Sequence, residues 1–198
     1  MSSQLDVEAD EGFHVLFVCT GNICRSAMAE RLARAVLGAD SPIRVTSAGT
    51  RATPGMEMPE RARRALVRLG GDPGGFAARP LTEELVAGSD LVLAATAGHR
   101  SEVAALHPPA VTRSFTIAEF GVLSRGVPAE AIIGHEDPVQ RARRLVAEAG
   151  ARRGLVRVDQ PDIADPFGRS RRAYRVAGRT IADALSVPLT LLTRSPVS

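Results

Sequence analysis

The spacing of apolar and polar residues along the chain predicts short buried strands that alternate with amphipathic helices. Strands are predicted at residues 13–19, 43–50 and 91–95, and the first is a continuous apolar run, as expected where both faces of a parallel sheet are covered. Apolar residues at helical spacing, with glycine or proline as stop signals, predict helices at 26–38, 59–70, 81–90, 98–106, 137–149 and 170–186.

Three further stretches are less regular. Residues 115–125 are predicted to begin as a strand and continue as a helix, and residues 155–161 are predicted to form the fourth strand or its remnant. Residues 188–192 either pack near the core or trail away from it. The sheet is therefore expected to have four strands.

This alternation is typical of an α/β fold. We expect an open, mainly parallel four-stranded sheet with helices on both faces and right-handed crossovers. Residues 1–12 are expected to form a disordered N-terminal lead, and residues 13–198 to form a single domain with an elaborated segment at about 120–154. Ligands of such sheets bind beyond the carboxyl ends of the strands, so functional residues are sought there.

Composition narrows the class of protein. The chain has 198 residues, of which 44% are hydrophobic, but it contains no apolar stretch of the roughly 20 residues that a membrane span needs. Its start is polar and acidic, unlike a secretory signal, and its two cysteines provide no disulfide framework and no four-ligand zinc set. We therefore expect a cytoplasmic protein with no membrane partner.

Charge adds little to this picture. The net charge is +3 and all 25 basic residues are arginines, scattered among acidic residues. One tyrosine and no tryptophan offer little surface on which bases would stack, so no nucleic-acid partner is expected.

The most informative segment is CTGNICRS at residues 19–26, between the first strand and the first helix. Backbone N–H groups of the turn and the positive end of the helix dipole should form a pocket for a tetrahedral dianion. The same field favours the thiolate form of Cys19, which makes it a candidate nucleophile. Arg25 adds a planar fork that binds two phosphate oxygens at once.

A cysteine followed six residues later by an arginine is common by chance, and a buried cysteine is most often a small core residue. The context favours a functional site instead. Gly21 and Asn22 stand where the turn needs unusual backbone angles, and Ser26 stands at a helix start.

A phosphate-transfer site also needs an acid that protonates the leaving oxygen. Asp165, in the segment DIADPFGRS, is the best candidate, because Pro166 stiffens the turn and Phe167 is placed to form one wall of a slot. Asp162 is the local alternative. An ordinary turn before the last helix would explain the same residues without any chemistry.

Four segments in this order resemble low-molecular-weight protein tyrosine phosphatases. They are VCTGNICRS near the N-terminus, TSAGT at 46–50, ARPLT at 78–82 and DPF at 165–167. The resemblance covers most of residues 13–187, which makes the expected domain phosphatase-like. The segment at 120–154 is longer than is usual for the family.

The resemblance implies a mechanism and a set of site residues. Cys19 would attack phosphorus to form a phosphocysteine, while Asp165 would act first as general acid and then as the base that activates water. No metal and no cofactor would be required. The phosphate-binding residues would be Thr20, Gly21, Asn22, Ile23, Cys24, Arg25 and Ser26.

Supporting roles follow from the same resemblance. Ser26 would donate a hydrogen bond to the Cys19 sulfur, and Asn22 would brace the loop against Ser47. Cys24 would be a redox residue that traps oxidised Cys19 as a disulfide.

The substrate pocket would be formed by Ile23, Thr53 and Phe167. An aromatic residue that family members often carry after SAGT is missing, with Thr53 nearby, and Gly168 stands where a second aromatic residue often follows DPF. Family members that act on phosphoarginine tend to carry threonine at the position of Ile23, so this chain resembles the tyrosine-directed type. The expected partner is a phosphotyrosine-containing protein or a small phosphorylated substrate.

Further functions stay open at this point. An arsenate reductase that uses an external small thiol would need only Cys19, whereas the thioredoxin-coupled kind needs further cysteines, and none follows Cys24. A phosphatase that acts on a small-molecule phosphate would also fit these residues, as would a non-enzymatic binder of phosphate.

The remaining candidate residues give weaker signals. The histidines, at 14, 99, 107 and 135, show no metal-ligand spacing. Arg169, Arg171 and Arg172 lie close to Asp165 in the sequence and are candidates for attracting acidic phosphopeptides.

Overall fold

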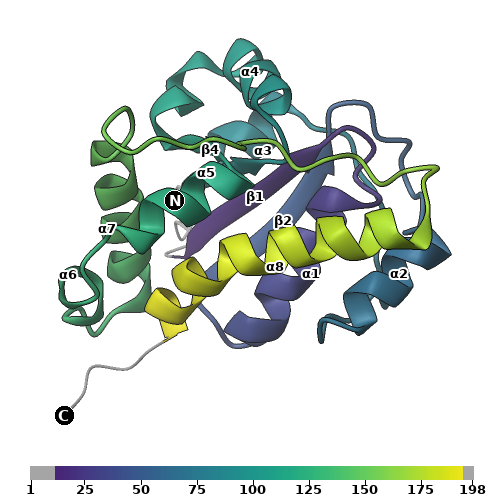
Figure 1. Cartoon of the computed structure of the whole chain (residues 1–198). Coiled ribbons are helices and arrows are strands. Elements are labelled where there is room, and N and C mark those ends of the chain that lie inside the picture. The colour runs from purple at the N-terminus through teal and green to yellow at the C-terminus, as the bar shows by residue number, and fades with distance from the viewer. Residues whose placement is uncertain (1–11, 194–198) are drawn as a thin grey trace, which may run out of the picture.

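A parallel sheet of four strands, in the order β2-β1-β3-β4, runs through the centre of the molecule (Figure 1). The computed structural model describes residues 12–193, so the expected N-terminal lead lies outside the described residues except for Gly12. The strands are β1 (Phe13–Cys19), β2 (Ile43–Gly49), β3 (Leu91–Ala94) and β4 (Ser114–Thr116). The helices are α1 (Arg25–Leu37), α2 (Glu60–Val67), α3 (Glu83–Ala87), α4 (Ala97–Leu106), the 3-10 helix η1 (Pro108–Arg113), α5 (Ile117–Arg125), α6 (Glu130–Ile133), α7 (Pro138–Ala151) and α8 (Arg171–Thr193).

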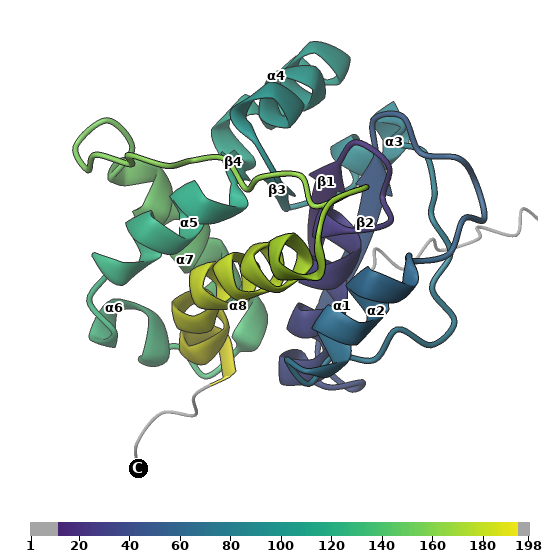
Figure 2. The ribbon, with the colours of Figure 1, turned by 45° about the vertical axis from the view of Figure 1, so that its right-hand side comes forward.

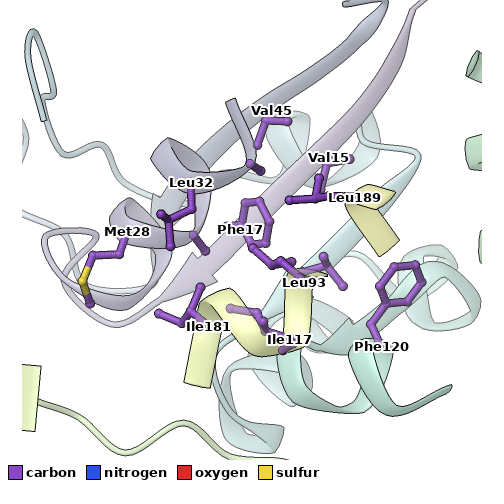
Figure 3. Close-up of a cluster of buried hydrophobic side chains, with 14 of the residues drawn as sticks. Val15, Phe17, Met28, Leu32, Val45, Leu93, Ile117, Phe120, Ile181 and Leu189 are labelled. Carbon is purple, nitrogen blue, oxygen red and sulfur yellow. The ribbon is translucent and has the colours of Figure 1, made fainter. Parts of the chain in front are cut away.

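Apolar side chains on both faces of the sheet bind it to two layers of helices. Val15 and Phe17 of β1 face a large core with side chains from α1, α5 and α8, several of which are labelled in Figure 3. Leu16 and Val18 face a smaller cluster that includes Val103 of α4. Figure 2 shows α4 on the opposite side of the sheet from α1 and α8. The expected α/β fold, with helices on both faces, is confirmed.

The position of β1 between β2 and β3 determines what surrounds its carboxyl end. β1 pairs with β2 over its full length, so Cys19 lies beside Gly49. β1 also pairs in parallel with β3, where Val18 lies opposite Ala94. The turn that follows Cys19 is therefore flanked by the segments that follow β2 and β3.

The prediction of a fourth strand at residues 155–161 is wrong. These residues form no strand, apart from one isolated bridge between Arg153 and Val156. Leu155 is 83% exposed, so this apolar stretch has no sheet to pack against. The fourth strand is instead β4, the short start of the 115–125 stretch, which continues as α5 as predicted.

Helix α8 is longer than predicted, because it passes through Pro188 and includes the stretch at 188–192. A proline inside a helix leaves the carbonyl four residues earlier, here that of Ala184, without its usual N–H partner. A Cβ built on Gly121 would lie only 2.5 Å from this carbonyl oxygen. Glycine thus permits close packing of α5 on α8 around the interrupted turn.

The segment at 120–154 contains most of α5 together with α6 and α7. Its buried residues Leu123, Ile132 and Leu145 belong to the same core as α1 and α8. The segment therefore extends the main core. None of the helices in the described part of the chain is both long and apolar enough to cross a membrane.

The connection from α7 to α8 crosses the carboxyl edge of the sheet, as the green trace in Figure 1 shows. It is attached there because the Ile163 N–H donates to the Ala95 carbonyl, just after β3, at 2.9 Å. This crossing brings residues 162–167 beside the turn that follows β1.

Candidate active site

The 19–26 loop, together with residues of the α7–α8 connection, encloses a cavity of about 190 Å³. Cys19 ends β1 and Arg25 begins α1, so the loop between them is a tight strand-to-helix turn. The cavity is lined by Cys19, Thr20, Gly21, Ile23, Cys24, Arg25, Asp165 and Phe167. A larger hollow of about 1270 Å³ lies at the start of β2 and includes neither cysteine, so we place the chemistry in the smaller cavity.

Asn22 holds the loop in a conformation that few residues adopt. Its φ of 53° is left-handed, and it is the only non-glycine residue of the described chain with a positive φ. Its amide nitrogen donates to Ser26 at 3.0 Å and to Ser47 at 2.7 Å, and its amide oxygen accepts the Arg79 N–H at 2.9 Å. These bonds offset the backbone strain, which is typical of functional sites.

Ser26 connects this bracing to the sulfur of Cys19. The Ser26 hydroxyl oxygen accepts from Asn22 and lies 3.0 Å from Cys19 Sγ. Asn22 donates to the hydroxyl oxygen, so the hydroxyl hydrogen is not used in that bond. It is therefore available to the Cys19 sulfur. A hydroxyl that donates to sulfur stabilises negative charge there, as a nucleophile or leaving thiolate requires.

Glu30, which is buried, and Arg79, which is partly buried, both contact Ser47 and hold it in place. The Ser47 hydroxyl donates to Glu30 at 2.5 Å, and the Arg79 Nε donates to the Ser47 carbonyl at 2.9 Å. Glu30 also pairs with Arg34 at 3.1 Å. Arg79 stands in the ARPLT segment that carries the resemblance, but no sequence pattern assigned a role to it or to Glu30, because each acts through a contact between segments distant in the chain.

Arg25 spans the cavity from the first turn of α1 to the α7–α8 connection. It is 5% exposed, and it donates to the Ile163 carbonyl at 3.1 Å and to the Asp165 carboxylate at 2.9 Å. Its buried Nε has no hydrogen-bond partner among the described residues. The guanidinium is thus fixed at the cavity with one donor still unsatisfied, as an anion-binding arginine would be.

The two candidate acids lie in different surroundings. Asp165 is half-exposed, lines the cavity beside Arg25 and accepts the Phe167 N–H at 3.1 Å. Asp162 does not line the cavity, and its carboxylate instead accepts the N–H of Ala97 at the start of α4, at 2.7 Å. Asp165 is therefore the carboxylate that can exchange a proton with a bound group.

Cys24 is buried next to the candidate nucleophile. Burial, followed by the proximity of Cys19, raises the pKa of the Cys24 thiol to about 12. At neutral pH Cys24 is therefore a thiol, and its side chain shares a hydrogen bond with that of Tyr174. Both cysteines are free in this structure.

The three predicted substrate-pocket residues are not all at the cavity. Ile23 lies in its wall, largely buried, and Phe167 lies at its mouth with 59% of its surface exposed. Thr53 is exposed in the turn after β2 and does not line the cavity. Thr53 stays a prediction for contact with a bound substrate.

The structure also brings His99, to which the sequence patterns assigned no role, against the loop. Its ring lies 2.8 Å from the Thr20 hydroxyl, across 79 residues of chain. The sequence offers one sign of this contact. His99 lies in the first turn of α4, the helix that follows β3, and β3 is the neighbour of β1. Among residues 12–193, no group of three or more histidine, cysteine or carboxylate side chains could hold a metal ion.

Comparisons with known proteins agree with this geometry. The protein-arginine-phosphatase of Bacillus subtilis (strain 168) is 34% identical over 139 residues, which cover 68% of this chain and 89% of that protein. A probable low molecular weight protein-tyrosine-phosphatase, EpsP of Ralstonia solanacearum, is 36% identical over 105 residues, covering 53% of this chain and 70% of that protein. The solved structure of the YwlE arginine phosphatase from Geobacillus stearothermophilus has a TM-score of 0.65 and 26% identity, with 90% of this chain and 91% of that one covered.

The family model described as low molecular weight phosphotyrosine protein phosphatase matches residues 14–130, more than half of the chain. That range contains the whole 19–26 loop and ends before Asp165. The chain belongs to the low molecular weight phosphotyrosine protein phosphatase family.

Proposed function

We propose that this chain hydrolyses phosphotyrosine in proteins through a phosphocysteine at Cys19, with Asp165 as general acid and base. The observation that carries the proposal is the arrangement of one cavity. Cys19 Sγ lies 3.0 Å from the Ser26 hydroxyl, and Arg25 and Asp165 form part of the same wall.

In the first step, a phosphoryl group would enter the 19–26 loop. Its oxygens would accept bonds from loop N–H groups and from Arg25, whose donors now reach Ile163 and Asp165. The Cys19 thiolate would form the S–P bond while the P–O bond to tyrosine breaks. The Asp165 carboxyl would give its proton to the departing phenolate oxygen, so that tyrosine leaves neutral.

In the second step, water would attack the phosphocysteine and give a proton to the Asp165 carboxylate. The S–P bond breaks, inorganic phosphate leaves and the thiolate is restored. The Ser26 hydroxyl, at 3.0 Å from the sulfur, would stabilise the thiolate as it departs. The two steps use one carboxyl group, first as acid and then as base.

The choice of tyrosine rests on Ile23. Relatives of this chain include both protein-arginine-phosphatases and protein-tyrosine-phosphatases, so the names alone leave both substrates open. The Ile23 side chain is apolar, largely buried and part of the cavity wall. It would pack against a phenol ring, whereas it would leave the N–H groups of a phosphoarginine desolvated and without partners.

The test uses two peptides of one sequence, one with phosphotyrosine and one with phosphoarginine. We expect kcat/KM to favour phosphotyrosine for the wild type, Ile23→Thr to shift the ratio towards phosphoarginine, and Cys19→Ser to abolish turnover of both. Turnover retained by Cys19→Ser would contradict the phosphocysteine. A wild-type preference for phosphoarginine would contradict the substrate.

A further inference from the structure

The buried ring of His99 links the helix after β3 to the 19–26 loop through two threonines. Its Nε2 lies 2.8 Å from the Thr20 hydroxyl, and its Nδ1 lies 2.7 Å from the Thr96 hydroxyl. His99 is 7% exposed, so its ring is largely shielded from water. Thr20 follows Cys19 directly and lines the cavity.

The direction of these hydrogen bonds follows from the donors already in use. The Thr96 hydroxyl oxygen accepts the backbone N–H of His99 at 3.2 Å, as the cap of α4. Its own hydrogen is then free to donate to Nδ1 of the ring. A neutral ring that accepts at Nδ1 carries its hydrogen on Nε2, which donates to the Thr20 oxygen.

The surroundings keep the ring neutral. Burial and then the charge of Arg25 lower the pKa of His99, and the weaker opposing effects come from Glu102 and Asp165. Arg51 acts in the same direction as Arg25. A neutral ring at neutral pH is what the donor-to-acceptor chain requires, since it leaves Nδ1 as an acceptor.

With its oxygen engaged by His99, the Thr20 hydroxyl has its hydrogen left to donate. Because Thr20 lines the cavity, an anion that enters the 19–26 loop would be the acceptor for this hydrogen. We propose that His99 is a positioning residue that orients the Thr20 hydroxyl as a hydrogen-bond donor to phosphate oxygens in the cavity. This inference rests on the proposed phosphatase function of that cavity, and it adds a donor outside the backbone of the loop.

Fixing this hydroxyl in advance has a kinetic consequence. A free threonine hydroxyl samples several orientations, and a donor already aimed at the developing charge needs no reorganisation during the reaction. The contribution of the Thr20 hydroxyl should therefore appear in kcat and in the binding of the phosphate oxygens. It should appear less in the binding of the rest of the substrate.

Two variants separate positioning from packing. In His99→Gln the amide nitrogen falls near the place of Nε2 and can still donate to Thr20, whereas in His99→Asn it falls near Nδ1 and reaches only Thr96. We expect His99→Asn to lower kcat for p-nitrophenyl phosphate about tenfold, the value of one well-placed hydrogen bond, and His99→Gln to lower it much less. If His99 serves only for packing, the two variants should lose equal amounts of kcat. That loss should follow the fall in the thermal stability of each variant.

The double variant that combines Thr20→Val with His99→Asn gives the second readout. Once the Thr20 hydroxyl is absent, His99→Asn should cause no further loss of kcat, so the two effects are coupled and not additive. Additive losses would overturn the proposal. Equal kcat values for His99→Asn and His99→Gln would overturn it as well.

Binding of inorganic phosphate distinguishes this proposal from the proposed function. Calorimetry should show weaker phosphate binding for His99→Asn than for His99→Gln, whether or not phosphotyrosine peptides are substrates. If phosphotyrosine is not hydrolysed but this difference is found, the proposed function fails and the role of His99 stands. If phosphotyrosine is hydrolysed and the two variants bind phosphate equally, the role of His99 fails alone.

Discussion

The 19–26 loop and residues 167–172 are stabilised very differently; we call the second segment the rim, because Phe167 at its start lies at the mouth of the cavity. In the loop, Asn22 and Ser26 are fully buried and each has more than one side-chain partner. Every residue of the rim is exposed. Several side-chain hydrogen bonds fix the geometry of the loop, whereas the side chains of the rim are exposed to solvent. We infer that the reaction is set by the loop and the choice of substrate largely by what surrounds it.

The largest effect is expected from a substitution in the 19–26 loop. Arg25→Lys keeps the charge but loses the planar fork that now reaches Ile163 and Asp165. We expect kcat/KM for p-nitrophenyl phosphate to fall by about 10³, because a donor to the transition state is lost. A steady-state assay measures this, with circular dichroism as the check on folding. A loss below about tenfold would mean that the fork is not needed.

The next effect tests the residue that joins loop and rim. Asp165→Asn removes the acid but keeps the shape, and we expect kcat to fall by about 10². The loss should be greater for phenyl phosphate than for p-nitrophenyl phosphate, because a poor leaving group depends more on the proton. Asp162→Asn is the matched control, since its amide oxygen still accepts the Ala97 N–H. Equal losses in both variants would contradict the role of Asp165.

A smaller effect is expected on the rim itself. Phe167→Ala removes an exposed ring at the mouth of the cavity, worth about 1 kcal/mol of stacking on a phenol. KM for a phosphotyrosine peptide should rise about fivefold, while inhibition by inorganic phosphate stays unchanged. Phe167→Tyr keeps the ring and should behave as the wild type. A change in phosphate inhibition would show that the ring also shapes the loop.

The smallest effect concerns charge on the rim. Arg171 and Arg172 are exposed in the first turn of α8, where no acidic residue balances the helix dipole. Reversing both to glutamate should lower kcat/KM about threefold for a peptide with acidic flanks, at low ionic strength only. Glutamates suit this end of the helix, so a loss of folding would not explain the change. An equal loss with an uncharged peptide would contradict this interpretation.

Local patterns were enough for the parts of the molecule that are set by neighbours in the chain. The bounds of β1 are those predicted, and the loop that follows it is the one whose glycine, asparagine and serine signalled a special turn. The apolar residues of 155–161 misled the prediction, because exposure of Leu155 depends on the absence of a neighbouring strand. A sequence pattern cannot report that absence.

Contacts between distant segments were the part that local patterns did not supply. His99 reaches Thr20 because β3 lies next to β1, and strand order is a property of the whole fold. A histidine in the first turn of a helix looks the same in the sequence whether it contacts a loop or water. The contacts of Glu30 and Arg79 with Ser47 were not predicted, for the same reason.

The phosphocysteine is tested most directly by trapping it. Asp165→Asn should still react with p-nitrophenyl phosphate, whose leaving group needs little help, but it lacks the base for the second step. After rapid acid quench, mass spectrometry should find one phosphoryl group per protein, located on Cys19. Continued turnover with no phosphoryl group on Cys19, or with the group on another residue, would contradict catalysis by this loop.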